Sequence, residues 1–236
     1  MDYFLSALSA ALGLILSFDP GVYQVVWTSI SIGLAATTIA ALFGVPLGLL
    51  VALHNFPGKH VLQQLLNTLM ALPTVVVGLL LYGLLSRQGV FGDWGLLYTP
   101  QAMIIGQAIL VVPIIWNLSI VAVNAADPRL GLTCRLLGAT RWQRNLVYLR
   151  ELRFGLLAAV VMGFGRAIGE VGVAMMLGGN IEGFTRTMTT AIALETSKGE
   201  FEFALALGLL LLLTAFVVNA VLYRFQHSDA LMLGRH

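Results

Sequence analysis

Two ionisable residues lie inside an otherwise apolar segment, and they are the first candidates for chemistry in this sequence. The stretch from residue 163 to 180 reads GFGRAIGEVGVAMMLGGN and contains Arg166 and Glu170, four positions apart. On a helix this spacing places both side chains on one face. A charge inside a bilayer costs at least about 2.5 kcal/mol and normally faces a partner or a wet cavity. We predict either an ion pair that pins helices together or an arginine that attracts an anion, with the glutamate moderating its affinity.

A hydroxyl-rich segment follows, between residues 183 and 196. Its threonines and single arginine suit either an anion entrance or a docking face for a protein partner, and a helix cap at the membrane surface is the alternative. A proline in an earlier apolar run could shape the same pathway through a kink, although ordinary packing also explains it. Besides the charged pair, the pathway candidates are Pro73, Thr74, Asn180, Thr185, Arg186 and Thr187.

Other chemistry is not indicated. The histidines (His54, His60, His227 and His236) do not have metal-ligand spacing, and Cys134 is the single cysteine, so we assign no metal site. No catalytic triad or paired carboxylates stand out, and Glu195, Glu200 and Glu202 are predicted to form an exposed face. The phosphate-binding pattern G-x-x-x-x-G-K-[ST] is absent, because the only Gly-Lys pair is followed by His60. We therefore predict no catalytic residues and no cofactor in this chain.

The composition indicates the class of fold that positions these residues. Apolar residues make up 58% of the 236 positions and charged residues 10%, against roughly 25% charged in a soluble domain. The apolar residues form long runs, which predicts a polytopic all-α membrane protein. A net charge of +2 says little about partners, and we expect no nucleic acid among them.

The runs give a count of about six helices in one transmembrane domain, residues 1–236. The first run, Tyr3 to Phe18, is 16 residues long; it would reach about 24 Å, short of the roughly 30 Å hydrocarbon core. It is therefore a thin or tilted span or a surface helix, and without a preceding basic residue it does not resemble a signal peptide. The five stronger runs are Val25–Leu53, Val61–Leu85, Gln101–Val123, Phe154–Gly179 and Phe203–Tyr223.

The orientation follows from the basic residues in the connecting loops. With the C-terminus inside, the inner side carries nine lysines and arginines, six of them between residues 124 and 153, and the outer loops carry three. If the first run does not cross, the later spans keep this orientation and only the N-terminus moves outside.

The long inner loop, about residues 125–153, has helical signals of its own. Asp127-Pro128 is typical of a helix cap followed by a first-turn proline. Gly138 and Ala139 divide the loop, so we predict two short amphipathic helices. Their apolar side chains suit a groove on a soluble partner, and their arginines suit anionic lipid. The apolar side chains are Leu132, Leu136, Leu137, Trp142, Leu146 and Leu149.

This loop resembles the cytoplasmic loop of ABC importer permeases, whose consensus is E-A-A-x3-G-x9-I-x-L-P. In LTCRLLGATRWQRNLVYLRE, Gly138 matches the consensus glycine, Leu-Thr-Cys replaces Glu-Ala-Ala, and Tyr148, Arg150 and Glu151 replace Ile, Leu and Pro. The stretch from Gly165 to Gly208 looks like oxyanion permeases, most closely the tungstate type. Its GGNI-x-G-x-TRTMTTAI pattern is shared in part with molybdate and sulfate permeases, and ALETSKGEF points toward tungstate.

The resemblance implies a type I importer permease in the cytoplasmic (inner) membrane, with a five-helix core plus an N-terminal helix. It implies a homodimer, two cytoplasmic subunits that bind and hydrolyse ATP with Mg²⁺, and an extracytoplasmic oxyanion-binding protein. The alternatives are a molybdate or sulfate importer and an ion-coupled secondary carrier, the latter disfavoured because the halves show no repeat. The coupling residues it implies are Thr133, Cys134, Arg135, Leu137, Gly138, Ala139, Thr140, Arg141 and Trp142.

Overall fold

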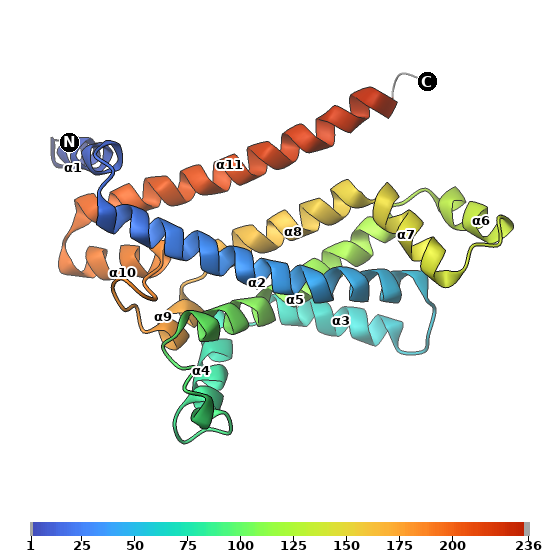
Figure 1. Ribbon diagram of the computed structural model, residues 1–236, viewed down its shortest axis with the longest axis horizontal. Coiled ribbons are helices and arrows are strands. Elements are labelled where there is room, and N and C mark those ends of the chain that lie inside the picture. The colour runs from blue at the N-terminus through green and yellow to red at the C-terminus, as the bar shows by residue number, and fades with distance from the viewer. Residues whose placement is uncertain (1, 234–236) are drawn as a thin grey trace.

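The computed structural model describes residues 2–233, and helices dominate it (Figure 1). This confirms the predicted all-α class. The helices are α1 Asp2–Leu16, α2 Pro20–Leu53, α3 Lys59–Met70, α4 Thr74–Leu85, α5 Pro100–Asn124, α6 Pro128–Leu136, α7 Arg141–Glu151, α8 Arg153–Ile168, α9 Gly172–Gly178, α10 Met188–Lys198 and α11 Phe201–Leu233, with a short 3-10 turn η1 at Gly92–Trp94.

The long helices α2, α5, α8 and α11 run lengthwise through the molecule, with α3 alongside α5 (Figure 1). The predicted coupling loop, α6 and α7, lies at one end together with the loop after α2. The helices α1, α9 and α10 lie at the opposite end, and α4 projects to the side. The predicted inner loops therefore share one end, as the orientation derived from the basic residues requires. Arg235, which entered that count, lies outside the described residues.

The close contact of α2 with α5 depends on two glycines one helical turn apart. A Cβ atom on Gly44 would lie 3.1 Å from the Cβ of Ile115, and one on Gly48 would lie 2.9 Å from the carbonyl oxygen of Trp116. Small residues at this spacing let membrane helices approach closely. Gly165 and Gly169 are also four positions apart, but Gly165 has nothing within 4 Å of its Cβ position. This second glycine pair therefore does not mark a helix contact.

Replacing Gly48 by alanine is expected to destabilise the protein by about 1–3 kcal/mol, because the new methyl group must displace the backbone of α5. The temperature at which half of the purified protein survives, read from the monodisperse peak on size exclusion, should fall. Gly165→Ala is the matched control and should leave that temperature unchanged or slightly higher, since alanine favours helix. Equal losses in the two variants would contradict the close packing of α2 on α5.

The first helix does not lie parallel to the long helices. Figure 1 shows α1 nearly end-on while α11 lies in the plane of the view. Ala7 and Ala11 are buried, and α1 packs against α11. Among the described residues, three helices are long and apolar enough to cross a membrane, and up to five spans result if each bent pair counts as one. Of the two interpretations of this segment, the orientation of α1 across the long helices favours the surface helix.

Two predicted spans are broken, which corrects the sequence interpretation. The run 61–85 divides into α3 and α4, which meet at 92°, and the run 154–179 divides into α8 and α9 at 59°. Pro73 produces a break rather than a kink because it disfavours a helical conformation at Leu72 and cannot donate a backbone hydrogen bond. In contrast, Pro46 and Pro113 lie inside continuous helices.

Candidate functional site

The two broken spans meet at their breaks. A Cβ atom on Gly172, the first residue of α9, would lie 2.8 Å from the hydroxyl oxygen of Thr74 and 3.2 Å from the backbone nitrogen of Val75 at the start of α4. Further along, the Cβ position of Gly78 is 3.3 Å from the Cα of Val173. Non-helical backbone at membrane depth is tolerated where it is buried in protein or lines a wet cavity. The junction of α4 with α9 is therefore closely packed within the protein.

Arg166 and Glu170 form the ion pair at this junction. Arg166 Nη1 donates to Glu170 Oε2 at 2.6 Å. The glutamate does not lie on the helix as predicted, because α8 ends at Ile168 and Glu170 follows the terminating Gly169. Its second carboxylate oxygen accepts a hydrogen bond from the backbone N–H of Val173 at 3.1 Å, and so satisfies an otherwise free donor in the first turn of α9.

Arg166 and Glu170 differ in exposure and in the hydrogen-bonding groups that remain unpaired. The Glu170 side chain is 3% exposed and both of its carboxylate oxygens are used, while its backbone carbonyl accepts a bond from the hydroxyl of Thr189 at 2.8 Å. The Arg166 side chain is 37% exposed. A guanidinium has five N–H donors, and only one bond of Arg166 is formed within the described part of the chain. Glu170 thus belongs to the fold, and Arg166 is the member that can still meet a ligand.

The hydroxyl-rich outer segment uses its polar groups internally. The buried Thr185 hydroxyl donates to the carbonyl of Gly178 at 2.5 Å and accepts from the N–H of Ile181 at 3.0 Å. Thr187 and Thr190 form a reciprocal cap at the start of α10. Asn180 has a left-handed backbone, and its amide donates weakly to the carbonyl of Thr190, 3.4 Å away. Of the alternatives for this segment, the helix cap is present, and these threonine hydroxyls are already engaged.

Glu195 corrects another expectation, because it is buried rather than exposed. Its side chain is 9% exposed, pairs with Lys198 at 3.0 Å and lies 3.9 Å from Arg186. Arg186, itself 14% exposed, also pairs with Glu182 at 3.3 Å. The three glutamates looked alike in sequence, but Glu195 faces the arginine of the preceding loop. Glu200 and Glu202 are exposed as predicted.

The inner loop forms the two predicted helices. The Asp127 carboxylate accepts from the N–H of Arg129 at 2.8 Å and so caps α6, which has its proline in the first turn. Gly138 has φ +66°, which turns the chain between the helices, and Thr140 and Gln143 form a capping box at the start of α7. The prediction of two short helices divided at Gly138 is confirmed.

The tip of this loop presents bare apolar side chains. Leu136 and Leu137 are 87% and 80% exposed, and Trp142 is 72% exposed. Arg135, Thr140 and Arg141 are also exposed. Cys134 is buried on the inner side of α6, and Thr133 donates its hydroxyl to the carbonyl of Arg129. At its base, Tyr148 packs with Leu49 and Val123. The loop is therefore anchored at its base and open at its tip, as a docking element must be.

A hollow that the sequence did not predict lies at the side of the molecule. A cavity of about 650 Å³ lies at the tip of α4, lined by Tyr82, Ser86, Arg87, Gln88 and Tyr98 among others. The hydroxyl of Tyr98 donates to that of Tyr82 at 3.3 Å, and this bond raises the pKa of Tyr98. Tyr98 also has φ +64°. Arg87 is one of the three basic residues of the predicted outer loops, and no sequence spacing links it to Tyr82 and Tyr98.

Within the described residues, no three histidine, cysteine, aspartate or glutamate side chains come close enough together to hold an ion. His54 Nδ1 lies 2.9 Å from the carbonyl oxygen of Leu50. The side chains of His227 and His236 lie outside the described residues.

Broken apolar spans that meet at a partly buried ion pair, with basic loops gathered at one end, are features found in multi-pass membrane transport proteins. The chain belongs to the family of binding-protein-dependent transport system inner membrane components, whose family model matches residues 44–228. It is thus a membrane component of a transport complex, a class to which the ABC importer permeases belong.

The chain is also similar to individual permeases over most of its length. It is 42% identical to the tungstate uptake system permease protein TupB of Peptoclostridium acidaminophilum, over 97% of this chain and all of that one. It is 30% identical to the molybdenum transport system permease protein ModB of Escherichia coli K12, over 74% and 82% of the two chains. The crystal structure of an amino acid ABC transporter has the same fold, with a TM-score of 0.67 at 19% identity over 91% of this chain and 96% of that one.

Proposed function

We propose that this chain is the permease of an ATP-driven tungstate importer. The observation that carries the proposal is the 42% identity to a tungstate uptake permease along nearly the entire chain. A second tungstate uptake permease, from Campylobacter jejuni, is 37% identical over 97% of the chain. Molybdate is the second candidate, supported by the 30% identity to a molybdenum permease.

The proposed pathway runs past the junction of α4 with α9. Arg166 contributes a half-exposed guanidinium beside buried Glu170, so the anion would meet a positive group whose charge is already partly balanced. A transporter must release what it binds, and a balanced arginine suits release better than an isolated one. Two copies of the chain would complete the pathway, and exposed apolar side chains of α4 such as Val75, Leu79 and Leu80 would then contact the second copy or lipid.

The loop of α6 and α7 would dock the ATP-hydrolysing partner. Its exposed apolar tip, led by Leu136, Leu137 and Trp142, suits a groove on a soluble protein. ATP and Mg²⁺ would be bound by that partner, and an extracytoplasmic binding protein would deliver the oxyanion. Closure of two partners would then move the loops and, through them, α5 and α8.

The substrate test measures ATP hydrolysis by the reconstituted transporter, with the binding protein loaded with tungstate, molybdate or sulfate. The expected result is the strongest stimulation with tungstate. Stimulation by sulfate alone would contradict the proposal. Uptake that persists without the ATPase subunit and collapses with an ion gradient would instead establish a secondary carrier.

A further inference from the structure

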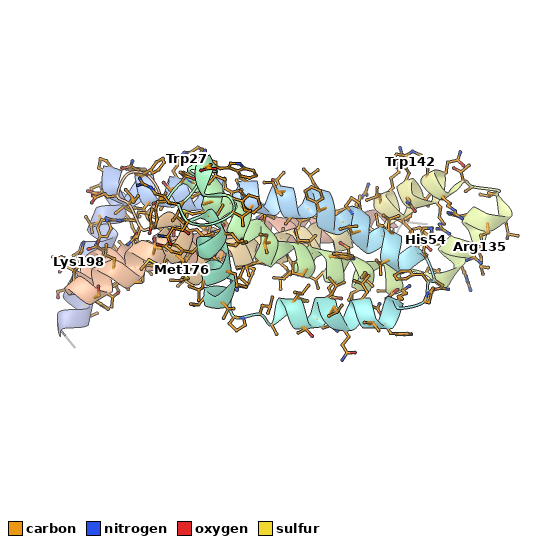
Figure 2. All side chains as sticks on the ribbon, turned by 90° about the horizontal axis from the view of Figure 1, so that it is seen from below. Trp27, His54, Arg135, Trp142, Met176 and Lys198 are labelled. Carbon is orange, nitrogen blue, oxygen red and sulfur yellow. The ribbon has the colours of Figure 1, made fainter. Side chains whose placement is uncertain are left out.

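A polar cavity of about 310 Å³ lies beneath the coupling loop. It is bounded by the inner ends of α2 and α5 on one side and by α6 and α7 on the other, so it joins the loop to the transmembrane helices. Figure 2 shows Arg135 at the same end of the molecule as His54, which follows α2, and Trp142 at the start of α7. The polar residues that line the cavity are Asn55, Asn124, Asp127, Arg135, Arg144 and Tyr148.

One buried donor that faces this region has no hydrogen-bond partner among the described residues. The Nε of Arg144 is buried and has no partner among the described residues. Leaving a buried donor of a charged group unpaired is destabilising, so an occupant that accepts a hydrogen bond from it would be favoured. The hydroxyl of Tyr148 also lines the cavity and reaches toward α6, 3.1 Å from the Cβ position of Gly131.

The charge of the lining is positive. Arg135 and Arg144 contribute two guanidiniums, and Asp127 contributes one carboxylate. One oxygen of that carboxylate already accepts the N–H of Arg129 at 2.8 Å, where it caps α6. The amides of Asn55 and Asn124 can also donate. Guanidinium forks and neutral donors are the groups that recognise tetrahedral oxyanions.

We propose that this cavity binds a tetrahedral oxyanion group from the cytoplasmic side. Its volume of about 310 Å³ equals roughly ten waters at about 30 Å³ each, which is room for such an anion and part of its hydration shell. The anion would come either as a free ion or as the phosphate of a lipid headgroup, since the cavity lies where the transmembrane helices end.

An occupant here would act on the coupling loop. Arg135 of α6 and Arg144 of α7 would be held to the ends of α2 and α5 through the anion, so the loop would open less often. This inference goes beyond the proposed function and does not depend on which ion is transported.

The test uses the full transporter in a non-ionic detergent that carries no phosphate group, so that no lipid phosphate is present at the start. Binding of radiolabelled phosphate and of molybdate is measured by equilibrium dialysis, and hydrogen exchange of residues 127–151 is followed by mass spectrometry. The variants are Arg144→Gln, and Tyr148→Phe, which removes only a hydroxyl. Arg150→Gln is the matched control, because it removes an exposed arginine of the same helix that does not line the cavity.

Saturable binding that slows exchange of the loop, weakened at least about tenfold by Arg144→Gln and unchanged in the control, would support a free ion. Slowed exchange only after phosphatidylglycerol is added, again lost in Arg144→Gln, would support the lipid phosphate. Tyr148→Phe should weaken either effect without loss of folding. Equal binding and exchange in the native, Arg144→Gln and Tyr148→Phe proteins would overturn the proposal, as would no response to any of the anions.

Discussion

Replacing Arg166 with alanine is expected to reduce tungstate uptake by at least about tenfold, which corresponds to about 1.4 kcal/mol in the transport barrier. The reason is that Arg166 is the half-exposed cation at the junction of the broken spans. Affinity for the loaded binding protein should be unchanged, because the residue lies inside the membrane. Uptake into proteoliposomes and binding-protein affinity are measured on the same preparation. Normal transport by a well-expressed variant would remove Arg166 from the mechanism.

A loss of folding must be separated from a loss of mechanism, because Arg166→Ala leaves Glu170 buried and unpaired. Breaking a buried pair from one side costs about 3–5 kcal/mol. The double variant Arg166→Gln with Glu170→Gln removes both charges, and its glutamine can still accept the hydrogen bond from Val173. If the Arg166–Glu170 pair only stabilises the break between α8 and α9, the double variant should regain both expression and uptake. If Arg166 meets the anion, expression should recover and uptake should not.

Replacing Gly138 with proline is expected to uncouple ATP hydrolysis from transport. Gly138 has φ +66°, whereas proline is fixed near −65°, so the turn between α6 and α7 cannot form as it stands. The exposed apolar tip of the loop would then face the wrong way. The measured quantity is the number of ions taken up per ATP hydrolysed, which should fall at least about tenfold, together with the stimulation of hydrolysis by the loaded binding protein.

Gly138→Asn is the matched control for this experiment. Asparagine is the side-chain residue that most readily adopts the left-handed backbone, so coupling should remain close to native. Unaltered coupling in the proline variant would count against the docking role of this loop. Equal losses in both variants would show that the backbone conformation at Gly138 is not what matters.

The sequence predicted those parts of the fold that depend on local chemistry. The two loop helices followed from Asp127-Pro128 and from Gly138, whose caps and turn are formed by neighbours in the chain. The all-α membrane class followed from the long apolar runs. The roles of the site residues, including Arg166, remain predictions that the experiments above address.

The sequence did not predict the properties that depend on contacts between distant segments. The break after Ile168 is not visible in an apolar run, because it depends on Glu170 capping α9 and on Thr189 holding the Glu170 carbonyl. The burial of Glu195 depends on Arg186, which the loop before α10 brings to it. The cavity beneath the coupling loop joins residues nearly a hundred positions apart. No local pattern encodes such pairings.

The position of Cys134 allows its thiol to report on the opening of the coupling loop. It is the only cysteine of the chain and lies buried on the inner face of α6, beside the turn at Gly138. A thiol reagent therefore has a single target in this subunit, and that target is exposed only when α6 lifts away from its support. The rate of labelling would measure loop opening in the unmodified permease during each stage of the ATP cycle, without any engineered label.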